Sequence, residues 1–202
     1  MDIDPSDLIE TARQAREQQD ARAARLNAAV AITVAVLATF MGICKVKDDN
    51  IVQAMQQAQA DKIDHWAFYQ ARNLRQEVAE ATVTQIELSK LAAPPAAASA
   101  HDAASQRYQA LAKEQALKKD QLKAQAEQDQ QTYDALNYRD DQFDLSDALI
   151  AIAIAMLAVT ALTRLWALYW ASLVPTALGV LMGVAGLTSL PIHPDALIKL
   201  LS

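Results

Sequence analysis

The chain has 202 residues, of which 52% are hydrophobic and 21% charged, with a formal net charge of −6 and one cysteine. A single cysteine excludes an internal disulfide, a cysteine zinc cluster and a thiol redox pair. Apolar and charged residues are segregated along the chain, which is typical of a protein divided between a membrane and water.

Residues 1–25 are polar and contain six acids and four arginines. Asp4 and then Pro5 predict a helix start, because the carboxylate caps free amides and proline lacks the donor that would stay unpaired there. This acidic stretch differs from the short basic region of a cleaved signal peptide. We therefore expect a polar helix over residues 1–25 that runs into the first membrane helix.

Three uncharged runs are long enough to approach the length needed to cross a hydrocarbon core of about 30 Å. They cover 19 residues from Leu26 to Cys44, 16 from Ala148 to Thr163 and 28 from Leu165 to Ile192. The predicted spans are residues 26–45, 146–165 and 166–190, followed by a short tail at 191–202. A buried helical hairpin in a soluble protein is the alternative, but so short a chain has little else to cover it.

The turn between the second and third spans is rich in residues that anchor helices at membrane interfaces, namely Arg164, Trp166, Tyr169 and Trp170. In the third span, Gly179, Gly183 and Gly186 form a seam of small residues that allows close helix packing. Spacing alone leaves open whether the partner helix belongs to the same chain or to another copy.

Residues 48–147 contain 17 acids, 10 bases and 16 glutamines and no glycine. The only prolines lie in AAPPAAAS at 92–99, which predicts a hairpin tip between two helical arms of about 70 Å each. The predicted fold is therefore all-α, with three transmembrane helices and a long antiparallel helical hairpin, or coiled coil, at 46–145. A disordered acidic loop is the alternative, which the abundance of strong helix formers disfavours.

The stretch DHWAFYQARNLRQ at 64–76 places three aromatic residues in a polar segment. At about 100° per residue, one face of the first arm is predicted to pack on the returning arm; it comprises Val52, Met55, Ile63, Trp66, Ala67, Leu74, Val78 and Ala81. Phe68 points elsewhere, on the side of Val83 and Ile86, with Tyr69 at its margin. A second apolar patch needs a second partner, which indicates another copy of the chain; scattered surface aromatics are the alternative.

The candidate self-association residues are Trp66, Phe68, Tyr69, Val83, Ile86, Gly179, Gly183 and Gly186. On the returning arm, Leu111, Leu122 and Tyr133 are spaced by eleven, which indicates a nearly straight or slightly right-handed supercoil.

No catalytic, cofactor or metal site is predicted. Asp61, Asp64 and His65 have a spacing that would let them converge on a cation, but they have no further ligand and are typical of solvated helix residues. The lack of a glycine-rich loop excludes that mode of nucleotide binding, and the excess of acids disfavours nucleic acid. Asp140, Asp141, Asp144 and Asp147 either draw cations towards a pore or mark the membrane boundary.

Arginine placement predicts the orientation. Arg13, Arg16, Arg22 and Arg25 precede the first span and Arg164 follows the second, so the N-terminus is expected in the cytoplasm and the hairpin in the periplasm. Lys45 and Lys47 favour the opposite orientation.

The run DHWAFYQARNLRQ and the run RDDQFDLSDALIAIAIAMLAVTALTR at 139–164 resemble bacterial membrane proteins of the domain of unknown function 4337 family. The resemblance extends through RLNAAVAITVAVLATFMGICKVKDDNIVQAM to the glycine-rich span, and its most specific element is Trp66, Phe68, Tyr69 and Gln70. It implies a three-span protein with a long polar insert after the first span, and it implies no reaction.

These patterns favour a non-enzymatic membrane scaffold that contacts the lipid bilayer and forms a homo-oligomer through its hairpin and its small-residue spans. Two alternatives remain open. In the first, the chain is a channel or an accessory subunit of a membrane complex, with acidic residues at the mouths of a conduit. In the second, it is an adaptor whose hairpin binds another, unknown protein.

Overall fold

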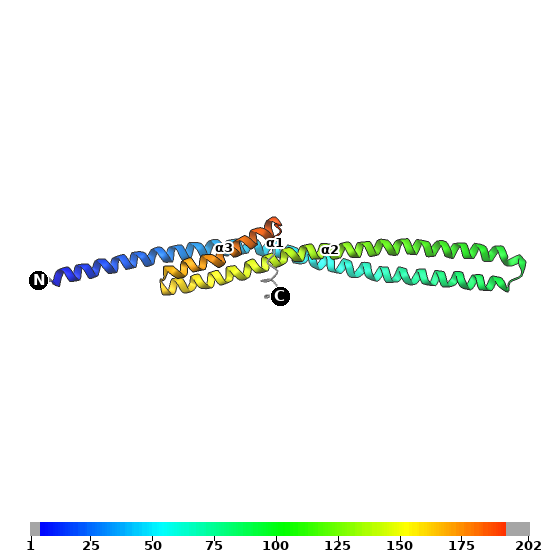
Figure 1. Ribbon diagram of the computed structural model, residues 1–202, viewed down its shortest axis with the longest axis horizontal. Helices are drawn as coiled ribbons and strands as arrows, with labels where there is room; N and C mark the ends of the chain where they lie inside the picture. The colour runs from blue at the N-terminus through cyan, green and yellow to red at the C-terminus, as the bar shows by residue number, and fades with distance from the viewer. Residues whose placement is uncertain (1–4, 193–202) are drawn as a thin grey trace. The chain divides into compact units, whose positions relative to one another are not determined.

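The computed structural model describes residues 5–192. Its elements are helix α1 (Pro5–Leu91), a short 3-10 helix η1 (Pro95–Ala97), α2 (Ala98–Thr163) and α3 (Trp166–Thr188) (Figure 1). No strand occurs in residues 5–192, so the all-α class is confirmed. The predicted cap at Asp4, and most of the predicted tail, lie outside the described residues.

Helix α1 is continuous because no proline and only one glycine, Gly42, interrupt the chain between Pro5 and Leu91. It ends where Pro94 takes an extended conformation, with φ −65° and ψ 150°. Helix α2 ends at Thr163 because the next residue, Arg164, has a left-handed φ of 57°, and the Arg164 amide donates to the Thr160 carbonyl at 2.8 Å. Each helix end therefore has a local cause in the sequence.

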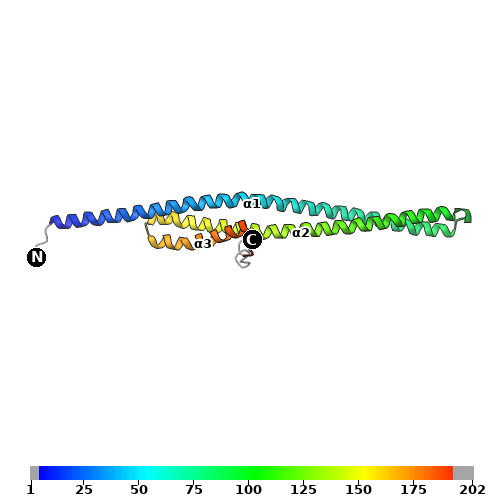
Figure 2. The same cartoon turned by 90° about the horizontal axis from the view of Figure 1, so that it is seen from above.

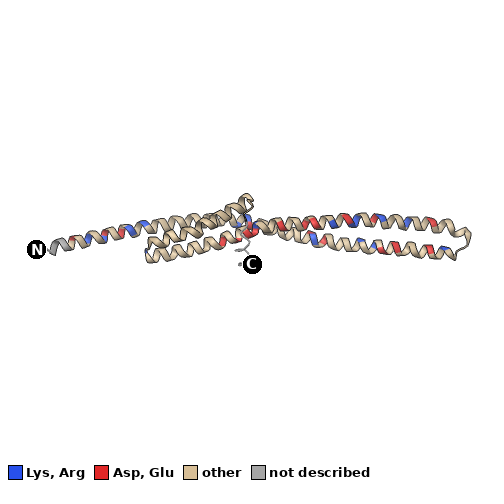
Figure 3. Cartoon of the chain, viewed as in Figure 1, with Lys and Arg blue, Asp and Glu red and all other residues tan. Residues whose placement is uncertain are grey.

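Among the described residues, three helices are long and apolar enough to cross a membrane, and these are α1, α2 and α3. Figure 3 shows long uncharged stretches in all three helices, whereas acids and bases alternate over the rest of α1 and α2. This distribution is that of a multi-pass membrane protein.

The chain divides into two compact units. The first comprises Met1–Ile51 and Tyr138–Ser202, and the second comprises Val52–Asn137. In the second unit, segments of α1 and α2 lie side by side in both views (Figures 1 and 2).

The core of the first unit is made by all three helices. Leu26 and Leu37 of α1 are buried with Ile150 and Leu157 of α2, and Val180 of α3 packs against them. A hydrogen bond of 3.2 Å between the hydroxyls of Thr33 and Tyr169 also joins α1 to α3. This unit therefore has an apolar core formed within one chain.

Candidate self-association surface and membrane boundary

The second unit is held together by a row of polar contacts between α1 and α2. Lys62 Nζ donates to Gln130 Oε1 at 2.5 Å, and His65 Nδ1 lies 2.6 Å from Asp129 Oδ2. Further along, Lys119 Nζ donates to Asn73 Oδ1 and Arg72 Nη1 to Gln115 Oε1, both at 3.0 Å, and Lys90 pairs with Asp102. Residue numbers in α2 fall as those in α1 rise, so the two segments run in opposite directions.

We call the residues between these segments the inner seam. Ten of its buried or half-buried positions in α2 recur at alternating steps of four and three residues, at His101, Ser105, Tyr108, Ala112, Gln115, Lys119, Leu122, Ala126, Asp129 and Tyr133. The half-buried Ala104, Ala116 and Gln130 each lie next to a member of this series. This is a seven-residue repeat, the spacing of a left-handed supercoil. Of the three residues with the eleven-residue spacing, Leu122 and Tyr133 belong to this series, whereas Leu111 is exposed. The handedness expected from that spacing stays a prediction.

The inner seam contains small and polar side chains where a coiled coil usually has leucine. Ala79 is 1% exposed and Gln115 4%, and the carbonyl oxygen of Gln76 is buried without a hydrogen-bond partner among the described residues. Hydrogen bonds between such groups add only about 0.5–1.5 kcal/mol each to stability, because water offers the same bonds to the unfolded chain.

Larger aliphatic side chains lie on the opposite side of α1. Leu74 is 62% exposed, and Ile63, Val78 and Leu88 are also exposed, as are the alanines between them. We call Ala60, Ile63, Ala67, Leu74, Val78, Ala81 and Leu88 the outer stripe of α1. Most of these residues were predicted to pack on the returning arm, and that prediction is wrong. The seam is instead occupied by polar groups, because the long aliphatic portions of the Lys62 and Arg72 side chains carry their charged ends across to α2.

The aromatic residues of DHWAFYQARNLRQ separate in the structure. Trp66 and Tyr69 are half-buried and meet edge to face with centroids 5.2 Å apart, and Lys119 Nζ lies 5.9 Å from the Tyr69 ring centre. Val83 and Ile86 are also half-buried on the inner side. Phe68 alone stays largely uncovered, at 60% exposure.

The three glycines of α3 contact the same chain. A Cβ added at Gly183 would lie 2.7 Å from the Phe40 ring and 2.8 Å from Ser146 Oγ, and one at Gly186 would lie 2.8 Å from the Phe143 ring. Ser146 also donates to the Gly179 carbonyl at 2.8 Å, a bond that sequence reasoning did not find. This seam is thus occupied within the protomer, which corrects its assignment to contacts between copies.

Side chains of α2 also bind the end of α3. Arg139 donates to the Gly186 carbonyl at 2.9 Å through Nη2, and Gln142 Nε2 donates to the carbonyls of Leu190 and Ile192 at 2.8 and 2.7 Å. The last carbonyls of a helix have no partner inside it, and a cation there also interacts favourably with the helix dipole. These contacts fix α3 on α2.

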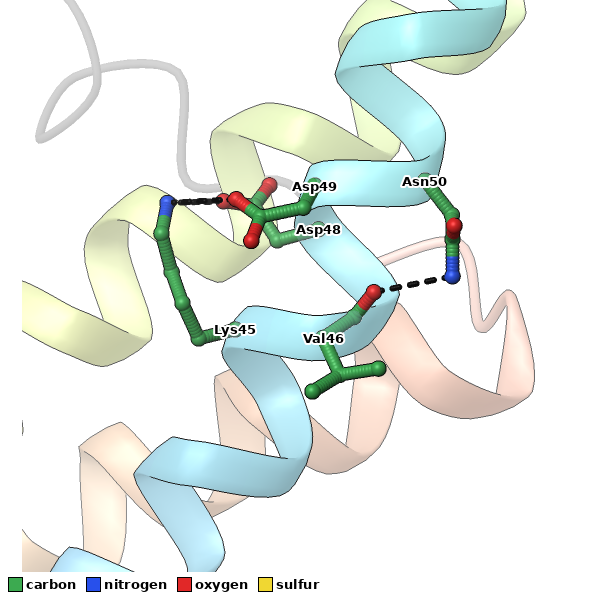
Figure 4. A network of polar contacts seen from close by, with 5 residues as sticks. All are labelled: Lys45, Val46, Asp48, Asp49 and Asn50. Carbon is green, nitrogen blue, oxygen red and sulfur yellow. Dashed lines mark hydrogen bonds and ion pairs between the residues drawn. The ribbon is translucent and has the colours of Figure 1, made fainter.

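A cluster of carboxylates lies at the membrane boundary of the first unit. Lys45 Nζ pairs with Asp48 Oδ2 at 2.8 Å and with Asp49 Oδ1 at 3.4 Å, while the Asn50 amide donates to the Val46 carbonyl at 2.9 Å (Figure 4). Asp48 is buried, and its Oδ1 has no partner among the described residues.

Asp140 of α2 faces this cluster. Burial raises the pKa of Asp140 to about 7, and the charges of Asp144, Asp48 and Asp141 add to the rise. Within residues 5–192 no group of three or more His, Cys, Asp or Glu is arranged to hold a metal ion, and Asp61 instead accepts a hydrogen bond from Gln57.

The predicted interfacial residues surround the turn between α2 and α3. Trp166 and Trp170 are exposed and each meets Tyr169 edge to face, at 5.7 and 5.8 Å between centroids. Their exposure leaves the indole rings free to reach lipid headgroups, as expected of an interfacial belt.

Comparison with curated proteins and with solved structures gives no match. A family model described as Domain of unknown function (DUF4337) matches residues 26–189, from the first span to the end of α3. The match covers most of the sequence and agrees with the resemblance of its two quoted runs. The chain therefore belongs to the DUF4337 family.

Proposed function

We propose that the protein is a non-enzymatic scaffold of the bacterial inner membrane that assembles with copies of itself. The paired segments of α1 and α2 act as an antiparallel coiled-coil hairpin, with the N-terminus in the cytoplasm and the hairpin in the periplasm. No reaction, cofactor or nucleic acid is part of this proposal.

One observation carries the proposal: the hairpin buries mainly alanine and polar groups inside, whereas several of its larger aliphatic groups lie outside. Burying one leucine, isoleucine or valine side chain stabilises a structure by about 1.5–3 kcal/mol, whereas an exposed ion pair contributes about 0–1 kcal/mol. Covering Leu74, Ile63 and Val78 would therefore stabilise the hairpin by more than the polar contacts of the seam beside them do. A partner that covers them would supply what the seam lacks.

A second copy fits this role because the protein is held in a bilayer, where copies are confined to one plane. In the second span, Ala151, Ala155 and Ala158 are exposed along one face of α2. Small residues at this spacing allow two membrane helices to approach closely. This alanine face replaces the glycine seam as the proposed membrane contact.

The test is the mass of the detergent-solubilised particle. We expect the native chain to form an oligomer, and we expect the triple variant Ile63→Gln, Leu74→Gln, Val78→Gln to be smaller, with the same helix content by circular dichroism. Leu91→Gln is the matched control, because Leu91 is 85% exposed at the end of α1 and outside the stripe.

A native particle that is monomeric at all concentrations refutes the proposal. If the monomer then retains a different protein on the native hairpin and loses it on the triple variant, the stripe is an adaptor surface.

A further inference from the structure

The outer surfaces of both helical segments carry the same repeat. Along α1, the exposed Ala60, Ala67, Leu74, Ala81 and Leu88 are seven residues apart. Along α2, the exposed Ala103, Ala110, Leu117 and Ala124 are also seven apart, and Leu117 is 67% exposed. We call this second set the outer stripe of α2. A seven-residue repeat of apolar positions is the pattern of a helix that packs along another helix.

Each outer stripe lies opposite the inner seam. Leu74 precedes the seam residue Gln76 by two positions, and Leu117 follows the seam residue Gln115 by two, which is about 160° around the helix in either case. The two stripes therefore lie on opposite edges of the hairpin. One neighbouring copy cannot cover both of them.

The two stripes also match in height. Asn73 bonds Lys119, so Leu74 is level with Lys118, next to Leu117. The other stripe residues match in the same way: along the hairpin axis, each α1 residue is within one residue, about 1.5 Å, of an α2 residue. The pairs are Ala67 with Ala124, Ala81 with Ala110 and Leu88 with Ala103. Copies related by rotation about the membrane normal have each residue at the same height. A neighbour in the same bilayer thus presents its α2 stripe level with the α1 stripe.

Charges beside the stripes are complementary in this arrangement. Glu77 and Lys113 lie about 60° and 40° to one side of Leu74 and Leu117, while Arg75 and Glu114 lie about 100° and 60° to the other side. Antiparallel helices bring flanks of the same hand together, so on one flank Glu77 of one copy faces Lys113 of the next. On the other flank Arg75 faces Glu114, which also pairs with Lys118 within α2. Arg75 and Lys113 have no ion-pair partner in the part of the chain that the structure describes.

We propose that the outer stripe of α1 in one copy packs antiparallel, at equal height, on the outer stripe of α2 in the next copy. This inference rests on the proposed self-assembly and names its contact. Because each copy uses two different surfaces, the contact is heterologous and extends into a closed ring or an open row of hairpins. A pairing of α1 with α1 would leave the α2 stripe uncovered.

Disulfide trapping in native membranes tests the contact. Chains with Leu74→Cys and chains with Leu117→Cys, differently tagged and co-expressed, are oxidised and separated on a non-reducing gel. We expect a disulfide between the two kinds of chain, at least ten times more abundant than in the pair Leu74→Cys with Ala124→Cys, which is one heptad out of register. The parent chain is the background control, because Cys44 is buried.

The chain with both Leu74→Cys and Leu117→Cys distinguishes the geometries. A heterologous contact gives a covalent ladder of three or more chains, and a ring ends the ladder at its own subunit number. Dimers alone, or Leu74→Cys chains that crosslink mainly to one another, overturn the inference. If the native particle is oligomeric and no trapped species forms, the inference fails and the scaffold proposal stands; a monomeric particle removes both.

Discussion

The two units of this protein use opposite arrangements of the same kinds of side chain. The first unit buries Leu26, Ile150 and Phe143 and places glycine where its helices meet, so one chain satisfies its own packing. The second unit buries mainly alanine, together with Gln115, and exposes Leu74, Ile63 and Val78. The difference indicates that the helices of the first unit pack on one another through a core of large apolar groups, whereas the second unit leaves many of its larger aliphatic groups outside its seam, as surface for a neighbour.

The largest expected effect breaks the first unit. Gly183→Ala forces a methyl group against Phe40 and Ser146, and overpacking of this kind costs about 1–3 kcal/mol of unfolding free energy. Gly42→Ala is the matched control, since a Cβ there meets nothing within 4 Å and alanine is the better helix former. The unfolding midpoint in detergent measures both. Equal midpoints would show that α3 is not fixed by this contact.

A gain of stability is expected from changing the inner seam. Gln76→Leu removes a buried oxygen without a partner and adds apolar burial, in a groove of about 320 Å³ also lined by Ala112 and Ala116. We expect unfolding free energy to rise by about 1–2 kcal/mol. The control Gln59→Leu, at an exposed position, is expected to change it by less than about 0.5 kcal/mol. A loss of stability on Gln76→Leu would mean that the polar seam is itself stabilising.

The helices and spans were predictable because their signals are local. Between Pro5 and Leu91 there is no proline and a single glycine, which predicts an unbroken α1, and uncharged runs mark the spans. The seam was not predictable from a count of apolar residues, because Gln76 and Gln115 resemble solvent-facing glutamines. The available signal was the repeat of small residues such as Ala79, Ala112 and Ala126. The contact of Gly183 with Phe40 was not predictable either, because the two residues are far apart in the sequence.

The boundary cluster predicts a pH dependence. The pKa of Asp140 rises from 3.8 to about 7 on folding, so its protonated form is favoured in the folded state. This contribution is complete below about pH 3.8, declines as pH rises and is absent above about pH 7. Asp48 and Lys45 of α1, and Asp141, Asp144 and Asp147 of α2, surround the site.

We therefore expect the native chain to lose thermal stability between about pH 4 and pH 7 and Asp140→Asn to lose less, because asparagine is neutral throughout. Asp120→Asn, an exposed change in the second unit, is expected to follow the native profile. An unaltered slope for Asp140→Asn would show that other groups carry the pH dependence.

The smallest expected effect concerns ion pairs of the second unit. Lys90 and Asp102 form a pair whose side chains are 42% and 53% exposed, so Lys90→Ala is expected to cost at most about 1 kcal/mol, and less at high salt. Lys123→Ala, which breaks a pair within α2, is the control for helix content. Thermal unfolding at two salt concentrations measures both changes. If Lys90→Ala instead costs more than Gln76→Leu gains, charge holds the two segments together near the turn. The exposed aliphatic stripes would then not be needed to stabilise the hairpin. The two units would differ only in their surroundings, lipid for the first and water for the second.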